Sequence, residues 1–232
     1  MMTTLNDLHH DPVSGLTYRI RPGQAGPGGA PAPCLLMLHG VGGNDANFID
    51  LAPHLDPAVT LVLVRGPLAL GPQQYAWFQV SFTANGPTIN PAQAEQSRLA
   101  LQQLVAQLPQ RHAIDATRIA IAGFSQGGTM SASVGLTAPG QVAGFAILSG
   151  RILPEVLPAV QQGPALARLR AFVGHGVHDQ KLGLHFAHQS RQVLGELGVP
   201  LDYHEYPAGH AFDAAMLADL KAWLGAVLAA TA

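Results

Sequence analysis

Cysteine and charge are both scarce in this sequence of 232 residues. Cys34 is the only cysteine, so the chain can form neither an internal disulfide nor a thiolate zinc site. Charged residues make up 11% of the chain, with 12 basic against 14 acidic side chains. Recognition of nucleic acid or of an anionic membrane surface needs clustered lysines and arginines. The composition therefore excludes nucleic acid as a partner and gives no sign of a disulfide-bonded secreted protein.

Long hydrophobic runs are also missing. The longest, residues 142–148 and 223–232, fall well short of the roughly 20 apolar residues that cross a bilayer. The first twelve residues include Asp7 and Asp11 and hold no apolar run of signal-peptide length. We therefore expect no membrane-integrated segment, no export, and a cytoplasmic location.

Apolar residues, by contrast, are plentiful at 48% of the chain. This content is sufficient for one sizeable core in a chain of this length. No linker or internal repeat interrupts the sequence. We expect a single domain over residues 1–232, with residues 1–14 as a loosely ordered N-terminal segment. The low charge and the high apolar content are also compatible with a homodimer.

Short apolar runs alternate along the chain with longer segments of helical periodicity. Strands are expected over residues 15–21, 34–40, 60–66, 118–124, 142–150, 171–176 and 200–206. Helices are expected over residues 46–54, 91–108 and 183–197, directly after Ser125, and from Ala211 onward. Runs such as Thr60–Val64 are apolar on both faces, which is typical of strands covered by helices on each side. The pattern predicts an α/β fold with a mostly parallel central sheet flanked by helices on both faces.

The motif Gly123-Phe124-Ser125-Gln126-Gly127 lies between an expected strand and an expected helix. In open parallel sheets, ligands bind at the carboxyl ends of the strands, where this motif falls. A G-x-S-x-G pattern in this context is typical of a nucleophile elbow, a strained turn that lifts the serine hydroxyl above the sheet. Side chains at Gly123 or Gly127 would collide with the neighbouring backbone. We therefore predict that Ser125 is a catalytic nucleophile.

A serine nucleophile needs a base to accept its proton and an acid to orient that base. In folds with a nucleophile elbow, the acid and then the histidine follow the serine in the chain. Asp179 is the acidic residue after Ser125 that directly follows a strand end. His210 lies in the last strand-to-helix loop, whereas most of the eleven histidines lie away from strand ends. We predict Asp179 as the orienting acid and His210 as the base.

An acyl-transfer site also needs two backbone N–H groups that converge on the developing oxyanion. One comes from the residue after the nucleophile, here Gln126, and the other from the loop after an early strand. The glycine-rich loop of residues 38–44 allows the backbone to turn its amides inward, and within it we assign Val41. His39, at the end of the preceding strand, is assigned to shaping this loop.

Five motifs run through the chain in the order LHGVGG, Ala76-Trp77-Phe78, GFSQGG, HGVHD and Gly209-His210. They resemble those of the phospholipase/carboxylesterase family of α/β-hydrolases, which includes the acyl-protein thioesterases. The likeness extends from about residue 35 to residue 223. It implies an α/β-hydrolase fold without a large lid domain. It also implies a serine ester or thioester hydrolase that uses no cofactor or metal, with the nucleophile, base, acid and oxyanion residues named above.

The segment Tyr75–Asn90 is long and polar enough to lie over the active site, where Trp77 and Phe78 would form an apolar wall for an acyl chain. Leu182, just beyond Asp179, is expected to line the same pocket. We therefore predict hydrolysis of small-molecule carboxylic esters with short to medium acyl chains, through an acyl-enzyme. Activity on acyl-protein or small-molecule thioesters, or on lysophospholipids, is the alternative at the same site.

Two rival functions also stay open. A metal-dependent hydrolase would draw on a cluster that comprises His175, His178, Asp179, His185 and His188. The cluster lacks the H-E-x-x-H spacing or a comparable one, and the serine arrangement already accounts for its aspartate. A non-catalytic binding module is the second rival, because fold alone does not fix function. The intact serine, aspartate and histidine argue against it.

Overall fold

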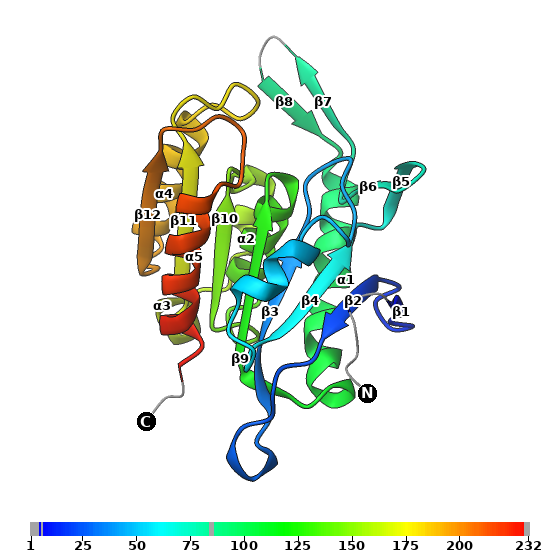
Figure 1. The fold of residues 1–232 in the computed structure, drawn as a ribbon. Coiled ribbons are helices and arrows are strands. Elements are labelled where there is room, and N and C mark those ends of the chain that lie inside the picture. Colours follow the sequence, from blue (N-terminus) through cyan, green and yellow to red (C-terminus); the bar gives the residue numbers. More distant parts are fainter. Residues whose placement is uncertain (1–4, 6, 84–85, 230–232) are drawn as a thin grey trace.

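A mostly parallel sheet of eight strands forms the centre of the molecule (Figure 1). The computed structural model describes residue 5 and residues 7–83 and 86–229. The strand order across the sheet is β1-β2-β4-β3-β9-β10-β11-β12. Their bounds are β1 (His9–His10), β2 (Thr17–Arg21), β3 (Ala32–Leu38), β4 (Thr60–Arg65), β9 (Ile114–Phe124), β10 (Gly144–Leu148), β11 (Arg170–Gly176) and β12 (Leu201–Tyr206). The six strands from β4 to β12 in this order are parallel, and β2 and β1 add an antiparallel edge. The predicted α/β class is confirmed.

Helices cover both faces of this sheet. The α-helices are α1 (Pro91–Arg111), α2 (Gln126–Thr137), α3 (Pro164–Arg168), α4 (His185–Glu196) and α5 (Ala214–Val227). Shorter 3-10 helices are η1 (Pro27–Gly29), η2 (Ile49–His54) and η3 (Pro154–Ala159). Side chains of α1, α2 and α4 belong to the hydrophobic cluster on one face, whereas those of η2 and α5 belong to the cluster on the other.

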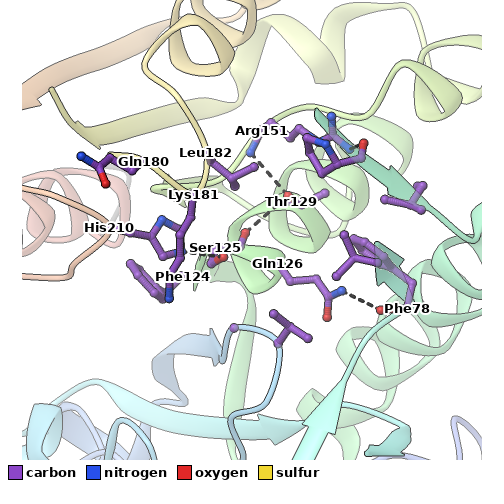
Figure 2. A pocket seen from close by; sticks show the side chains of 15 residues that line it. Phe78, Phe124, Ser125, Gln126, Thr129, Arg151, Gln180, Lys181, Leu182 and His210 are labelled. Atoms are coloured by element: carbon purple, nitrogen blue, oxygen red, sulfur yellow. Dashed lines mark hydrogen bonds between the residues drawn. The ribbon is translucent and has the colours of Figure 1, made fainter. Parts of the chain in front are cut away.

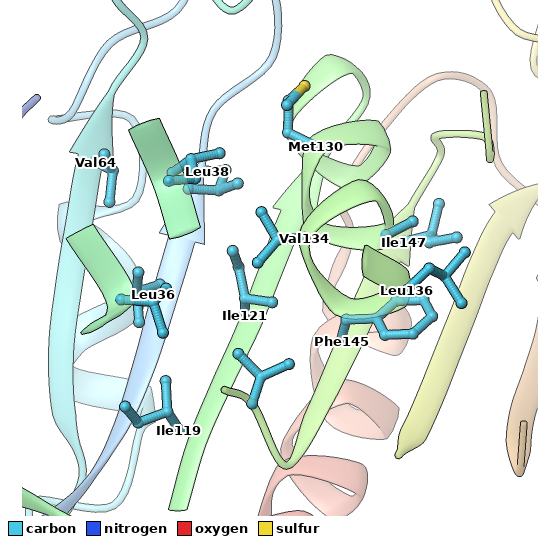
Figure 3. Packing of buried hydrophobic residues seen from close by; sticks show 14 of the residues in the cluster. Leu36, Leu38, Val64, Ile119, Ile121, Met130, Val134, Leu136, Phe145 and Ile147 are labelled. Atoms are coloured by element: carbon cyan, nitrogen blue, oxygen red, sulfur yellow. The ribbon is translucent and has the colours of Figure 1, made fainter. Parts of the chain in front are cut away.

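The two faces are filled by alternate residues of the same strands. In β9, Ile119 and Ile121 pack into the cluster under α1 and α2, while Ala120 and Ala122 pack into the cluster under α5. Figure 3 shows Ile121 between strand β3 and the side chain of Val134 on α2. Successive side chains of a strand point to opposite faces, so burial on both faces demands an unbroken apolar run. This explains why these strands do not alternate between polar and apolar residues.

Most predicted elements are confirmed within a few residues, but the helix expected over residues 46–54 is wrong. Residues Ile49–His54 form the 3-10 helix η2, which contains Pro53. Proline has no N–H to donate and disfavours a longer α-helix. Helix α5 begins at Ala214 rather than Ala211, because the Asp213 side chain caps it by accepting a hydrogen bond from the Met216 N–H at 2.9 Å.

The N-terminal segment differs from the expected loosely ordered one where it is described. Residues 1–4 and 6 lie outside the described residues. Strand β1 pairs with β2, which fixes residues 9 and 10 to the sheet. The buried Asp11 carboxylate accepts a hydrogen bond from the Ser14 N–H at 2.6 Å and forms an ion pair with Arg111 at 2.9 Å. These contacts join the segment to the C-terminal end of α1.

Two small hairpins fill the segment between β4 and α1. Strands β5 (Leu68–Gly71) and β6 (Gln74–Ala76) form the first, and β7 (Val80–Thr83) and β8 (Gly86–Ile89) form the second. Figure 1 shows the β7–β8 hairpin projecting from the carboxyl end of the sheet. Residues 84 and 85, in the polar stretch after the aromatic pair, lie outside the described residues. Within the described residues, no helix has both the length and the apolarity to cross a membrane.

Candidate active site

Ser125 occupies a strained turn between the last residue of β9 and the first residue of α2. Its backbone has φ 55° and ψ −116°, a conformation that side-chain-bearing residues rarely adopt. The Ser125 N–H donates to the Leu148 carbonyl at 2.7 Å, which ties the turn to the end of β10. Such strain persists only where surrounding structure fixes it, and it is typical of functional sites. The local geometry is that of the predicted nucleophile elbow.

Glycines on both sides of the turn allow strand and helix to approach this closely. A Cβ on Gly123 would lie 2.3 Å from the carbonyl carbon of Gly127. A Cβ on Gly127 would lie 2.2 Å from the Leu38 carbonyl oxygen at the end of β3. Neither distance is tolerable, and in both cases the obstacle is backbone. The elbow therefore requires glycine at these two positions.

The side chains of Ser125, His210 and Asp179 form a continuous hydrogen-bonded chain. The Ser125 hydroxyl donates to His210 Nε2 at 2.9 Å, and His210 Nδ1 donates to Asp179 Oδ2 at 2.6 Å. The Phe124 ring packs against the His210 imidazole with centroids 4.8 Å apart. Figure 2 shows His210 beside Ser125 at the edge of a cavity. The structure thus brings together three residues from the carboxyl ends of β9, β11 and β12.

Several contacts hold the Asp179 carboxylate in place. Its Oδ1 accepts from the backbone N–H groups of Lys181 and Leu182 at 2.8 and 2.9 Å. The buried His175 donates from Nε2 to the Leu182 carbonyl at 2.7 Å and lies 3.3 Å from Asp179 Oδ2. Burial lowers the pKa of His175, which favours its neutral form. The turn of residues 179–182 therefore fixes the Asp179 carboxylate through Oδ1, while Oδ2 accepts the hydrogen bond from His210.

The histidine-rich segment is not arranged as a set of metal ligands. Asp179 is engaged with His210, and His188 of α4 forms a hydrogen bond with Glu205 of β12 at 2.9 Å. In the part of the chain that the structure describes, no group of three or more histidine, cysteine, aspartate or glutamate side chains is arranged so that it could hold a metal ion. The donor set proposed for the metal-dependent rival does not converge.

The two predicted oxyanion donors flank Ser125. Gln126 is the first residue of α2, where a backbone N–H has no partner within the helix. On the other side, Gly40 lies so close that a Cβ on it would be 3.3 Å from Ser125 Cβ. The Gly40 carbonyl accepts from His39 Nδ1 at 2.7 Å and from the Gly43 N–H at 3.0 Å. In the trans peptide between Gly40 and Val41, the carbonyl and the N–H point in opposite directions. Because the Gly40 carbonyl faces His39, the Val41 N–H points away from His39. The geometry supports both donors, whose role stays a prediction.

His39 has one tautomer imposed on it by its neighbours. The Gly66 N–H donates to His39 Nε2 at 2.9 Å, so Nε2 carries the lone pair and Nδ1 carries the proton given to Gly40. The imidazole is 1% exposed, and burial lowers its pKa. His39 therefore shapes the glycine loop, as its place in the sequence indicates. Its pairing with Gly66 has no signal in the sequence.

The side chain of Gln126 connects the elbow to the aromatic pair. Its Oε1 accepts from the Trp77 N–H at 2.7 Å. Its Nε2 donates to the Phe78 carbonyl, also at 2.7 Å (Figure 2). The Trp77 indole N–H donates to the His39 carbonyl at 2.8 Å, and the Ser97 hydroxyl donates to the Trp77 carbonyl at 2.5 Å. The segment before the β7–β8 hairpin is thus fixed on three sides.

The prediction that Trp77 lines the substrate pocket is wrong. The Trp77 side chain is fully buried in the core, with its indole N–H bonded to backbone, and it does not reach the cavity. Trp77 and Phe78 lie in the bend between β6 and β7, and of the two only Phe78 lines the cavity.

A cavity of about 480 Å³ opens beside Ser125. Its lining residues are Gly40, Val41, Phe78, Val80, Pro87, Ile89, Phe124, Ser125, Gln126, Thr129, Arg151, Gln180, Lys181, Leu182 and His210. Phe78 and Leu182 are among them, as expected. Val80 and Ile89 of the hairpin, together with Arg151, were not found by sequence reasoning, because nothing local in the sequence shows which side of the hairpin or of the turn after β10 faces inward.

Comparisons with known proteins agree with this picture. A sequence profile described as Phospholipase/Carboxylesterase matches residues 25–228. Acyl-protein thioesterase 1 of Mycosarcoma maydis is 28% identical over 226 residues, which cover 86% of this chain and 93% of that protein. Acyl-protein thioesterase 1 of Yarrowia lipolytica is 26% identical over 207 residues, which cover 82% and 89% of the two chains.

Solved structures show the same fold. A carboxylesterase from Mesorhizobium loti superposes with a TM-score of 0.76 at 24% identity, covering 94% of this chain and 98% of that one. The Bacillus cereus carboxylesterase gives a TM-score of 0.77 at 17% identity, covering 91% and 94%. The predicted α/β-hydrolase fold is confirmed, and no large lid domain is evident in the described residues.

The buried His39 predicts that the protein loses stability in acid. Its folded-state pKa lies below the value of about 6.5 for a free imidazole. As the pH falls below about 6.5, the unfolded chain therefore binds a proton at His39 before the folded chain does. This contribution to the free energy of unfolding is fully present above about pH 6.5 and is lost as the pH falls through the folded-state pKa. Urea unfolding at a series of pH values should show this loss, and it should be smaller in His39→Asn. An equal pH dependence in both proteins would contradict the assignment.

Proposed function

This chain belongs to the phospholipase/carboxylesterase family, and we propose that it hydrolyses carboxylic esters through a serine acyl-enzyme. Membership of the family supports hydrolysis of an ester or a thioester. The serine mechanism is carried by one observation, the hydrogen-bonded chain from Ser125 through His210 to Asp179, with distances of 2.9 and 2.6 Å. We assign these residues as nucleophile, general base and orienting acid.

The proposed reaction has two halves that use the same groups. As Ser125 Oγ attacks the ester carbonyl carbon, His210 Nε2 accepts the hydroxyl proton, and the new imidazolium is stabilised by Asp179. The tetrahedral intermediate collapses, the bond to the leaving oxygen breaks, and His210 returns the proton to the departing alcohol. A water molecule then attacks the acyl-enzyme with His210 again as base, which releases the acid and restores Ser125.

The negative charge on the tetrahedral oxygen would be stabilised by the N–H groups of Val41 and Gln126. Both belong to elements fixed before the substrate binds, since His39 holds the glycine loop and the Gln126 side chain is bonded at both ends. Preorganised donors of this kind need no rearrangement during the reaction. The N-terminal end of α2 adds a favourable dipole at the same point.

The cavity supports small-molecule substrates with short to medium acyl chains. Phe78, Val80, Ile89 and Leu182 offer an apolar wall, and each methylene buried against it contributes up to about 0.8 kcal/mol. The lining also includes the cationic side chain of Arg151, which bonds the Pro87 carbonyl of β8. A chain that reached past the apolar residues would meet a cation, so added carbons should cease to help.

A thioester substrate is the second candidate, favoured by the named activity of the relatives from Mycosarcoma maydis and Yarrowia lipolytica. The same proton transfers serve a thiol leaving group, because His210 would protonate sulfur in place of oxygen. Matched oxygen and sulfur esters of one acyl group, compared by kcat/KM, separate the two candidates.

Replacement of the nucleophile tests the proposed mechanism. Ser125→Ala should lower kcat for a p-nitrophenyl ester by several orders of magnitude, and Asp179→Asn should lower it less, because other contacts still hold His210 in part. A fluorophosphonate should label Ser125 in the wild-type protein, as read by mass spectrometry of peptides.

Ser149→Ala is the matched control for this experiment. Ser149 lies at the end of the adjacent strand β10, is also buried with positive φ, and its hydroxyl has no hydrogen-bond partner among the described residues. Its replacement should leave kcat near the wild-type value. Near wild-type activity of Ser125→Ala, or phosphonate label on another residue, would refute the proposal.

The cavity wall predicts a limit to acyl chain length. For p-nitrophenyl esters from acetate to palmitate, kcat/KM should rise over the first added carbons and then level off or fall. Ile89→Ala should lower kcat/KM for hexanoate by about threefold to tenfold and leave acetate nearly unchanged, because acetate does not reach β8. Leu99→Ala, which alters an exposed leucine of α1, should affect neither ester. A steady rise through sixteen carbons would contradict the account.

A further inference from the structure

The cavity beside Ser125 is lined by positive charge without any negative charge. Of the 15 residues that line it, Arg151 and Lys181 are cationic, and none is an aspartate or a glutamate. In Figure 2, Lys181 lies with His210 on one side of Ser125, while Arg151 lies beyond Thr129 on the other. The chain as a whole is slightly acidic, with a formal net charge of −2, so this local excess of positive charge is a property of the cavity.

Within the described residues, the contacts that hold Arg151 in place include no carboxylate. It follows Ser149 and Gly150 after β10, and its backbone N–H lies 3.4 Å from Thr129 Oγ1. Its guanidinium makes one long hydrogen bond, at 3.4 Å, to the Pro87 carbonyl of β8, and its Cζ lies 4.9 Å above the Phe186 ring. Within the described residues it forms no ion pair.

Five of the ten arginines form no ion pair within the described residues, and of these five Arg151 is the one that lines the cavity beside Ser125. Those that pair with carboxylates are Arg19, Arg65, Arg98, Arg111 and Arg118. Arg151 is half-buried, and burial lowers its pKa although Glu155 acts in the opposite direction. A desolvated guanidinium without a carboxylate partner is unfavourable unless a ligand supplies the negative charge. Its five N–H donors match a carboxylate, which can accept two of them in parallel.

We propose that Arg151 is a binding site for a carboxylate carried by the substrate, a few bonds away from the ester that Ser125 attacks. This inference rests on the proposed function and names its substrate class, esters that bear a free carboxylate. The methylenes between ester and carboxylate would contact the apolar wall formed by Phe78, Val80 and Leu182. Because Arg151 and His210 lie on opposite sides of Ser125, the substrate anion would bind away from the Asp179 carboxylate.

The test compares each anionic ester with its own neutral methyl ester. For the acyl side, the pair is p-nitrophenyl hydrogen glutarate and p-nitrophenyl methyl glutarate. For the alcohol side, it is para-acetoxybenzoate and methyl para-acetoxybenzoate. The measured quantity is the ratio of kcat/KM for the anionic to the neutral ester, in wild type, Arg151→Gln and Arg191→Gln. Arg191 is the matched control, since it also stacks on an aromatic ring, Tyr203, but lies on α4 outside the cavity.

We expect Arg151→Gln to lower this ratio by about tenfold to hundredfold in one of the two pairs, and Arg191→Gln to leave it unchanged. The affected pair identifies whether the carboxylate belongs to the acyl or to the alcohol part. A ratio that Arg151→Gln leaves unchanged in both pairs, or that Arg191→Gln lowers equally, overturns the inference.

A binding measurement separates failure of this inference from failure of the proposed function. Titration of Ser125→Ala with glutarate in a calorimeter needs no turnover, and binding should weaken by a similar factor when Arg151→Gln is added. If the wild type cleaves none of the four esters, the proposed function fails, whereas Arg151-dependent binding would still support the carboxylate site. Absent binding, or binding that Arg151→Gln leaves unchanged, overturns the inference whatever the esterase result.

Discussion

The close approach of Gly127 to the end of β3 is the constraint on which the site depends. A Cβ at this position would lie 2.2 Å from the Leu38 carbonyl oxygen, so α2 can begin this near the sheet only with glycine there. The approach leaves a single residue, Ser125, to connect β9 to α2, and that residue adopts a positive φ. Backbone strain of this kind is sustained by the packing of α2 on the sheet. The result is a hydroxyl above the strand ends, next to the helix N-terminus and the glycine loop.

A buried hydrogen-bond network then joins the parts of the site into one unit. His39 links the Gly66 amide to the Gly40 carbonyl, and the Trp77 indole donates to the His39 carbonyl. The Gln126 side chain accepts from the Trp77 N–H and donates to the Phe78 carbonyl. Displacement of any one group would leave others buried without a partner, which costs about 1–3 kcal/mol each. The elbow, the glycine loop and the segment leading to the hairpin therefore hold one another in position before substrate binds.

Sequence reasoning located Ser125, Asp179 and His210 because each follows a strand in a fold whose strand ends converge, so position along the chain was sufficient. It assigned both Trp77 and Phe78 to the substrate pocket, because two adjacent aromatic residues do not show in the sequence which one faces the core. The hairpin of β7 and β8 was expected only as a long loop over the site. The sequence around Arg151 does not indicate that this arginine lines the cavity. Its position depends on contacts with Pro87 and Phe186, which are distant from it in the chain. The sequence therefore predicted the helices and strands better than the contacts between segments that are distant in the chain.

We propose that Ser125 lies between two backbone N–H groups that are positioned to bind an oxyanion. A crystal structure of the protein after reaction with a fluorophosphonate tests it directly, because the phosphonyl oxygen occupies the place of the tetrahedral oxygen. We predict phosphorus bonded to Ser125 Oγ and the phosphonyl oxygen about 2.7–3.1 Å from the backbone nitrogens of both Val41 and Gln126. A phosphonyl oxygen directed to solvent, or bonded to neither nitrogen, would contradict it.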